Sequence, residues 1–180
     1  MIRLFVAVDL PEGLRDQVAE IGRGLTGARR VPREQLHLTL RFIGEVEDKV
    51  FKAALTALKE IKAPPFKLAL KGLGHFPPGK HPKVFWAGLE RSVPLLELQK
   101  QVELTLTGVG IAPEEKKFSP HLTLARLKET PADVVSALEE HYREFGSGPF
   151  KISEFHLYSS ILTRTGAIHK REATYRLLPY

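Results

Sequence analysis

The tetrapeptide HLTL occurs twice in this chain of 180 residues, at residues 37–40 and at residues 121–124. Successive side chains of an extended strand point to opposite faces, so each copy places an imidazole and a hydroxyl on one face and two leucines on the other. An imidazole titrates near neutrality and can act as a base or as an acid within one turnover. The repeat therefore predicts two matched arms that each offer a proton-transfer group and a hydroxyl.

Two such arms suit a displacement at the phosphorus of a phosphodiester. That reaction needs one group to activate the incoming oxygen and another to protonate the leaving oxygen. His37 and His121 are the candidate catalytic pair, and the hydroxyls of Thr39 and Thr123 are candidates for binding phosphoryl oxygens. A single strand with an exposed histidine and threonine is commonplace, so it is the duplication that indicates chemistry. The residues do not decide which histidine is the acid, because matched arms are interchangeable.

Hydrophobic periodicity predicts the elements that must position these arms. Strand patterns run over residues 2–10, 29–31, 36–42, 66–73, 83–89, 119–127, 150–160 and 173–178, with the third strand ended by Gly44. Helical patterns run over residues 11–25, 48–61, 92–107 and 131–145. Hairpin-linked strands interleaved with helices indicate an α+β fold of antiparallel or mixed sheets with helices on their outer faces. We expect one domain of residues 1–180 in two pseudo-symmetric lobes, with an active-site groove between the sheets.

The composition limits the classes of function. Without cysteine, the chain has no disulfide, thiolate zinc site or cysteine nucleophile. A net charge of +6 favours an anionic partner. Basic residues precede both motifs, and we expect them to form a basic rim that binds RNA phosphates and loses affinity with added salt. They are Arg29, Arg30, Arg33, Lys116 and Lys117.

The chain carries no pattern of a membrane protein. Its start has no long basic-then-apolar leader, and nowhere do about 18 apolar residues run together. We therefore expect a cytoplasmic protein without membrane contact. We also expect a monomer, because no long heptad run is present. The absence of asparagine and the interspersed charges favour a thermophilic source.

Further segments extend the two motifs into a family resemblance. They are RLFVAVDLP, HLTLRFIGEV, FSPHLTLAR and LYSSILTRTG, followed by Tyr175. With these residues the chain resembles, over nearly its whole length, the two-histidine phosphoesterase superfamily, and within it the RNA 2′,3′-cyclic phosphodiesterases, also called 2′-5′ RNA ligases. The resemblance implies an enzyme without metal or other cofactor. Its substrate would be RNA with a 2′,3′-cyclic phosphate end, opened to a 2′-phosphomonoester, and the reverse reaction with a 5′-hydroxyl would form a 2′-5′ linkage.

The resemblance also implies roles for the two motifs. His37 would be the proton donor to the departing 3′ oxygen, and His121 the proton acceptor that activates water. Thr39 and Thr123 would hold the nonbridging oxygens of the phosphate.

Three further residues are candidates for binding substrate. Phe42 and Arg126 each stand five residues after a motif histidine, and the resemblance places Arg126 near the phosphate and Phe42 near a nucleobase. Strict alternation puts both out of phase with the histidines unless a bulge reorients the strand. Phe42 is otherwise expected in the core. Arg41 has the phase of His37, although an arginine near a strand end is commonly a solvated surface charge.

Two other functions stay open. A phosphodiesterase for small cyclic nucleotides would make the basic rim incidental, and an RNA-binding protein without catalysis would use its strands as a platform for bases. A zinc-dependent hydrolase is a weaker alternative, because His75 and His81 flank a proline-rich segment with no third ligand nearby and so predict a loop. We expect Trp86 in the core of a strand. The remaining histidines, expected to be surface or hydrogen-bonded residues, are His141, His156 and His169.

Overall fold

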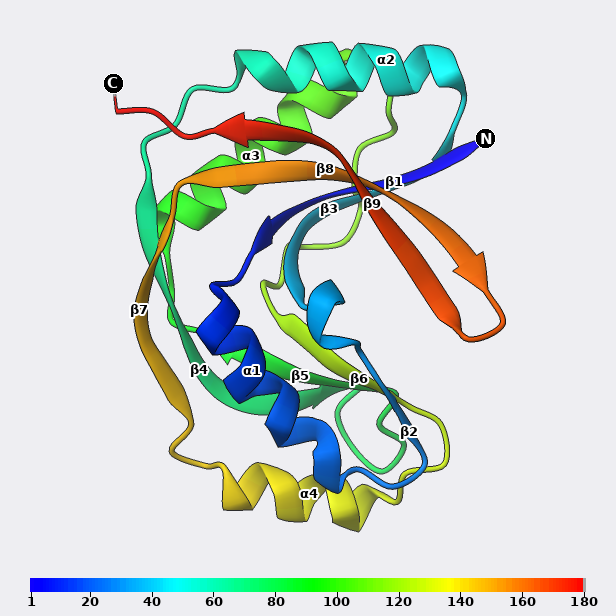
Figure 1. Ribbon diagram of the computed structural model, residues 1–180, viewed down its shortest axis with the longest axis vertical. Helices are drawn as coiled ribbons and strands as arrows, with labels where there is room; N and C mark the ends of the chain where they lie inside the picture. The colour runs from blue at the N-terminus through cyan, green and yellow to red at the C-terminus, as the bar shows by residue number, and fades with distance from the viewer. Residues whose placement is uncertain (180) are drawn as a thin grey trace.

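The computed structural model describes residues 1–179 and confirms the α+β class (Figure 1). The strands are β1 (Ile2–Asp9), β2 (Ala28–Arg30), β3 (His37–Val46), β4 (Phe66–Phe76), β5 (Val84–Leu89), β6 (Leu122–Leu127), β7 (Gly146–Ile152), β8 (Glu154–Thr163) and β9 (Gly166–Arg176). The helices are α1 (Glu12–Ile21), α2 (Asp48–Ala57), α3 (Val93–Gly108) and α4 (Ala132–His141), with short 3₁₀-helices η1 (Gly22–Gly24), η2 (Arg33–Gln35) and η3 (Leu58–Glu60). No helix in this part of the chain is long and apolar enough to cross a membrane.

The strands form two sheets that repeat one arrangement. The first sheet has the order β3-β1-β8-β9 and the second the order β2-β6-β5-β4-β7, and the strand pairs within both are antiparallel. In each sheet the strand that holds an HLTL motif pairs with an earlier strand, β1 for β3 and β5 for β6. One helix, α1 or α3, lies between the paired strands in the chain. Apart from β2, the two sheets thus show the pseudo-symmetry that the repeat predicts.

Helices α1 and α3 are exchanged between the two sheets. Helix α1 follows a strand of the first sheet, yet its Ile21 is buried with Phe85 in the core of the second sheet. Helix α3 follows a strand of the second sheet, yet its Leu98 and Val102 are buried with Val6 in the core of the first. Figure 1 shows the result, with α2 and α3 beside the first sheet and α1 and α4 beside the second. Each sheet therefore completes its core with a helix from the other half.

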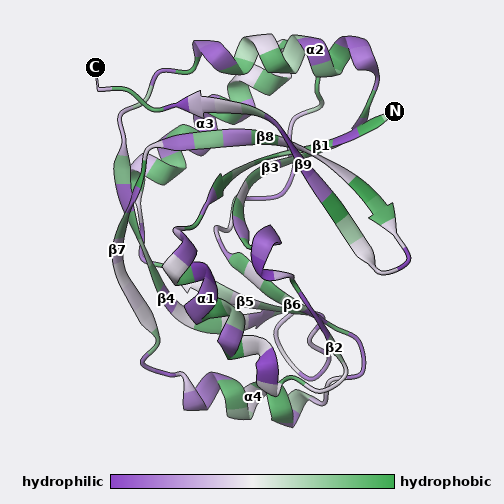
Figure 2. Ribbon diagram, viewed as in Figure 1, coloured by the Kyte–Doolittle hydropathy of each residue, from purple (hydrophilic) through white to green (hydrophobic). Residues whose placement is uncertain are grey.

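Helices α2 and α4 complete the outer layers. Hydrophobic and hydrophilic residues interleave along both of them (Figure 2), as expected for helices with one face in the core and one in water. Ala54 of α2 and Val135 of α4 are fully buried, one in each core. The helices thus lie on the outer sides of the sheets, and the opposite faces of β3 and β6 are left for the site.

Several predicted strand boundaries are wrong. The last strand, predicted over residues 173–178, is β9 and begins at Gly166. The predicted strand over residues 150–160 is two strands, β7 and β8, in different sheets. The chain changes sheet at Ser153, between Ile152, which pairs with β4, and Phe155, which pairs with β9. Hydrophobic residues continue on both sides of Ser153, so periodicity alone cannot show the change. Gly44 does not end β3, which continues past this residue with a φ of +85° there.

Candidate active site

The two HLTL segments show the same pattern of burial. In the first copy both leucines are buried in the core beneath α2 and α3, whereas His37 and Thr39 are only partly covered. In the second copy both leucines are buried beneath α1 and α4, whereas His121, just before β6, and Thr123 are only partly covered. Because helices cover the leucine faces, both histidine faces are turned away from the helical layers.

A β-bulge stands at the same position in both arms. In the β1–β3 pair the register shifts by one residue between Thr39 and Arg41, so Leu40 is the extra residue. The β5–β6 pair shifts at the equivalent place, with Leu124 as the extra residue. A bulge of this kind reverses the alternation of the residues that follow it. The two arms therefore share an irregularity as well as a sequence.

The bulges bring Phe42 and Arg126 into phase with the histidines. Both side chains are exposed, Phe42 by 58%, whereas the residue before each of them is buried. Phe42 is thus not a core residue, and its ring lies 5.9 Å from that of Phe5 on the neighbouring strand. Contact of Phe42 and Arg126 with substrate stays a prediction.

The same bulge turns Arg41 away from the site, contrary to the predicted phase. Its side chain is buried, with 6% exposed. The guanidinium donates to the carboxylate of Glu103 in α3 and to the backbone oxygens of Phe42 and Ala112. Its donors are committed to the protein, so Arg41 does not line the site beside His37.

Arg41 instead ties the first arm to the segment that leads to the second. Glu103, its ion-pair partner, also accepts the backbone N–H of Glu114 at 2.8 Å. Residues 112–121 contain no helix or strand, so such bonds position the approach to His121. Arg41 is thus a structural link between the two motifs.

The two motif strands meet although they belong to different sheets. Strands β3 and β6 are in contact, and Figure 1 shows them together in the middle of the molecule. The segment before β3 reinforces this contact, because β2 pairs with β6 and the N–H of Val31 donates to the carbonyl of Leu124 at 2.8 Å. The structure therefore brings together β3, which holds His37 and Thr39, and β6, which holds Thr123 and directly follows His121.

His37 packs into an aromatic wall that the repeat did not indicate. Its ring is stacked on Phe5 at 4.9 Å and lies 6.0 Å from Tyr158 and 5.4 Å from His169, all between ring centroids. These neighbours come from β1, β8 and β9. Burial, and then the charge of His169, lowers the pKa of His37 to about 4, although a backbone hydrogen bond with Gln35 acts in the opposite direction. His37 is therefore neutral near pH 7 in the free protein.

His121 is oriented by a backbone carbonyl. Its Nδ1 lies 2.7 Å from the oxygen of Ser119, and a proton on Nδ1 that bonds this acceptor leaves Nε2 free to exchange a proton. The imidazole contacts Phe76 edge-on at 5.1 Å and lies 6.4 Å from Trp86. Trp86 is partly exposed on this face and not in the core as predicted. Its ring covers Gly74, where a Cβ atom would meet it at 2.4 Å.

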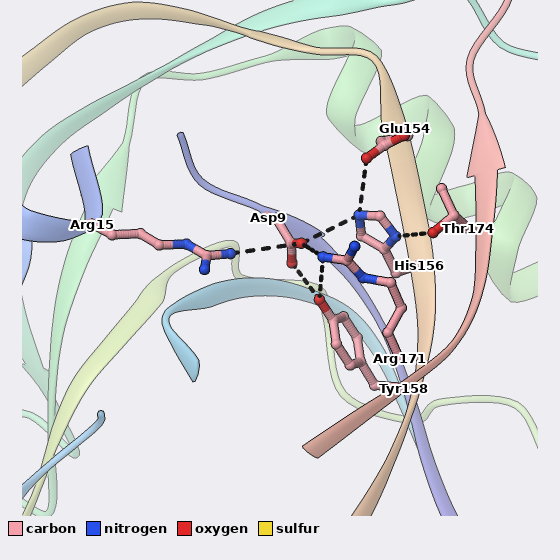
Figure 3. A network of polar contacts seen from close by, with 7 residues as sticks. All are labelled: Asp9, Arg15, Glu154, His156, Tyr158, Arg171 and Thr174. Atoms are coloured by element: carbon pink, nitrogen blue, oxygen red, sulfur yellow. Dashed lines mark hydrogen bonds and ion pairs between the residues drawn. The ribbon is translucent and has the colours of Figure 1, made fainter. Parts of the chain in front are cut away.

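A charged network at the end of β1 supports the wall around His37. The carboxylate of Asp9 accepts hydrogen bonds from the Tyr158 hydroxyl at 2.6 Å and from Arg171. It also lies 3.6 Å from Arg15 and 3.4 Å from Nε2 of His156 (Figure 3). Burial, together with the hydrogen bond to Asp9, raises the pKa of Tyr158 to about 12, so its hydroxyl stays a donor. The network fixes Tyr158, whose ring stacks on that of Phe5.

These supporting residues were not among the predicted site residues. Phe5, Asp9 and Tyr158 lie in the segments RLFVAVDLP and LYSSILTRTG, and the family resemblance was the signal that could have pointed to them. His169, expected to be a surface or hydrogen-bonded residue, belongs to the wall of His37. His156 is a buried, hydrogen-bonded polar residue, one of the expected outcomes.

The other histidines lie outside the motif strands. His75 belongs to β4 and not to a loop as predicted, and its Nδ1 lies 2.6 Å from a carboxylate oxygen of Glu139. His81, in the turn that follows, is exposed, as is His141 at the end of α4.

The predicted basic rim is partly free for an anion. Arg29 faces Arg126 directly across the β2–β6 pair, and both side chains are exposed. Lys116 and Lys117 are exposed in the segment before His121. Of the two remaining residues of the basic rim, Arg30 is exposed, whereas Arg33 pairs with Asp16 of α1. Two exposed arginines therefore stand side by side near the second motif.

Comparison with known proteins agrees with this arrangement. The model of the 2′-5′ RNA ligase superfamily matches residues 10–163. An RNA 2′,3′-cyclic phosphodiesterase of Aeropyrum pernix is 39% identical over 161 residues, which cover 87% of this chain and 89% of that protein. An RNA 2′,3′-cyclic phosphodiesterase of Archaeoglobus fulgidus is 34% identical over 172 residues, which cover 94% of this chain and 97% of that protein.

Solved structures show the same fold. TT0787 of Thermus thermophilus superimposes with a TM-score of 0.80 at 29% identity, and the match covers 97% of each chain. Escherichia coli LigT complexed with 3′-AMP superimposes with a TM-score of 0.78 at 25% identity over 98% of each chain. The chain therefore belongs to the 2′-5′ RNA ligase superfamily and, within it, to the RNA 2′,3′-cyclic phosphodiesterase family.

Proposed function

We propose that this protein hydrolyses the 2′,3′-cyclic phosphate ends of RNA to 2′-phosphomonoesters, without a metal, by acid–base catalysis from His37 and His121. The observation that carries the proposal is the contact between two strands that present the same histidine and threonine before the same bulge. The names of the relatives support the substrate class. The reverse reaction, with an RNA 5′-hydroxyl in place of water, would form a 2′-5′ linkage.

In this proposal the two imidazoles lie on opposite sides of one phosphorus atom. His121 accepts a proton from the attacking water through Nε2 while the new P–O bond forms. The bond from phosphorus to the 3′ oxygen breaks, and His37 gives that oxygen a proton. The hydroxyls of Thr39 and Thr123 donate to the nonbridging oxygens, where negative charge increases.

Phe42 and Arg126 extend the same two faces beyond the bulges. We assign Arg126, with Arg29 beside it, to the phosphate groups of the substrate, because a guanidinium binds phosphate oxygens with paired donors. Phe42 offers an exposed ring on which a nucleobase can stack. The two arms thus carry the same proton-transfer groups but bind different parts of the substrate.

The low pKa of His37 sets a condition on its role as the donor. Below about pH 4 the free imidazole is protonated and above that value it is neutral, so a donor near pH 7 must gain its proton when substrate binds. An opposite charge within about 4 to 6 Å raises a pKa by about 1 to 3 units, and the phosphate supplies such a charge.

We therefore expect the pKa of His37 to rise by about 1 to 3 units when a nucleoside 2′-phosphate binds. The measurement is an NMR titration of the His37 ring with and without this ligand, with exposed His81 as the control ring. If the ligand binds and the pKa of His37 stays near 4, His37 is not the donor and the two roles are reversed.

Replacing Thr39 or Thr123 by valine is expected to lower kcat/KM by about 5- to 150-fold, which corresponds to about 1 to 3 kcal/mol. Valine keeps the shape of threonine but cannot donate to a phosphoryl oxygen. Thr56→Val on the exposed side of α2 is the matched control and should leave kcat/KM unchanged. Wild-type kcat/KM in both site variants would show that neither hydroxyl contacts the phosphate.

The proposed function is tested with an oligonucleotide that ends in a 2′,3′-cyclic phosphate, incubated with the protein in EDTA. A 2′-phosphate product supports the proposal, and a 3′-phosphate product shows that the other P–O bond is broken. Abolition by EDTA would favour a metal enzyme. Turnover of small cyclic nucleotides alone, or RNA binding without turnover, would support one of the two alternative functions. A 5′-hydroxyl RNA added to the reaction tests for the 2′-5′ linkage.

A further inference from the structure

The hairpin formed by β8 and β9 exposes an unusual set of side chains for the surface of a small protein. Among its large hydrophobic residues, Leu162 is 64% exposed, Ile161 68% and Ile168 58%. Of the hairpin's cations, Arg171 pairs with Asp9 and Lys170 lies 3.7 Å from a carboxylate oxygen of Glu172, whereas Arg164 in the exposed turn has no ion pair among the described residues. An apolar surface beside an unpaired arginine matches a single nucleic-acid strand, whose bases are apolar on their faces and whose backbone is anionic.

The β8–β9 hairpin contacts the segment that precedes His37. The side-chain amide of Gln35 in η2 donates to the carbonyl of Ala167 at 2.6 Å. His169 of the same hairpin lies 5.4 Å from the ring of His37. The hairpin extends beyond the other strands of its sheet (Figure 1), but these two contacts join it to the wall of the site.

Strand pairing decides which hairpin residues share the face of this wall. Ser160 lies opposite His169, and Leu162 lies opposite Ala167. Residues directly opposite in an antiparallel pair point to the same face, and so do residues two apart in one strand. Leu162 is thus on the same face as His169, one step of about 7 Å further from His37. Ile161 points to the other face.

We propose that Leu162 and His169 form a subsite for the nucleotide that precedes the cyclic-phosphate nucleotide in the RNA chain. The step of about 7 Å between neighbouring positions on one strand face is close to the spacing of successive nucleotides in an extended strand. Leu162 supplies an apolar contact for the second base or its ribose, and Arg164 in the adjacent turn attracts the RNA phosphates. This inference rests on the proposed function and specifies an RNA chain as its substrate.

The test compares two substrates, a tetranucleotide with a 2′,3′-cyclic phosphate end and a single nucleoside 2′,3′-cyclic phosphate. Leu162→Ser is expected to raise KM for the tetranucleotide by about five- to tenfold and to leave kcat unchanged, because a contact away from the reacting atoms contributes uniform binding. Turnover of the single nucleotide should be unchanged. Ile161→Ser, at the neighbouring and equally exposed position of the opposite face, is the matched control and should affect neither substrate.

Each result decides the matter. Equal loss on both substrates would mean that Leu162 supports the site itself, and unchanged kinetics on the tetranucleotide would mean that no nucleotide contacts it; both overturn the subsite. An equal effect of Ile161→Ser would mean that both substitutions act by destabilising the hairpin and not through a subsite. Failure of the wild-type protein to open either cyclic phosphate would instead refute the proposed function. Binding of a tetranucleotide that ends in a 2′-phosphate, measured by fluorescence anisotropy, would still report on the subsite in that case.

Discussion

Replacing either His37 or His121 by alanine is expected to lower kcat for the opening of an RNA 2′,3′-cyclic phosphate by about 10²- to 10⁴-fold. Each variant removes one of two proton transfers that accompany a single displacement at phosphorus. The double variant should lose little more than the less active single variant, because groups that act in one step do not contribute independently. The measurement is single-turnover kinetics on an oligonucleotide with a cyclic phosphate end.

Loss of activity must be separated from loss of structure, because His37 packs against Phe5 and the rest of the aromatic wall. His37→Gln keeps much of the side-chain volume without the proton-transfer function and should be as inactive as His37→Ala. Thermal unfolding and the affinity for a product oligonucleotide should stay close to wild type in the glutamine variant. His81→Ala, at an exposed position, is the control for any histidine substitution. Retention of more than a tenth of the activity in either single alanine variant would contradict the two-histidine mechanism.

Replacing Arg41 by methionine is expected to lower the free energy of unfolding by about 2 to 4 kcal/mol. Methionine keeps the buried stem but removes the guanidinium that donates to one carboxylate oxygen of Glu103 and to the carbonyl of Ala112, and only the N–H of Glu114 still donates to Glu103. Urea denaturation at neutral pH measures the loss. Arg143→Met, which removes only exposed ion pairs, is the control and should change stability by less than about 0.5 kcal/mol. An equally small effect of Arg41→Met would show that the buried pair contributes nothing.

The loss of stability in Arg41→Met should also depend on pH. Burial by itself would raise the pKa of Glu103, but hydrogen bonds from Arg41 and from the backbone of Glu114 hold it below its ordinary value. A lowered carboxyl pKa contributes stability above the unfolded-state value and loses it as the pH falls through the folded-state value. The difference between wild type and Arg41→Met should therefore shrink in acid.

Arg41→Met should lower kcat as well, because the lost bonds position the segment that leads to His121. The double variant Arg41→Met, Glu103→Leu removes the carboxylate that has lost its ion pair and should recover part of the stability, although the N–H of Glu114 then loses its acceptor. It does not restore the bond to Ala112, so kcat should stay low. Full recovery of both the free energy of unfolding and kcat would mean that the link between the two arms contributes only to stability.

The features that the sequence predicted correctly are those that local periodicity determines. Alternating leucines gave both motif strands and the side on which His37 and Thr39 lie, because burial of one strand face is a local pattern. The phase of Arg41 and Phe42 depends on a bulge, and a bulge is defined by the register with a partner strand that periodicity does not reveal. The resemblance to a family was needed to single out Phe42 and Arg126 at all.

The wall around His37 could not be predicted from spacing, because Phe5, Tyr158 and His169 come from three strands that are far apart in the chain. The same reason explains why residues 150–160 read as one strand. Both halves of that stretch are hydrophobic in the period of a strand, and only the pairing of Ile152 with β4 and of Phe155 with β9 separates them.

The exchange of α1 and α3 has a consequence for how activity is lost. Since each sheet buries a helix that the other half contributes, neither half has a closed interior of its own, and melting one would open apolar surface in the other. Cooperative unfolding is the expected result for such interlocked halves. No partly unfolded form should then keep one of the two histidines in its native position without the other. Activity and native structure should therefore be lost in the same unfolding transition.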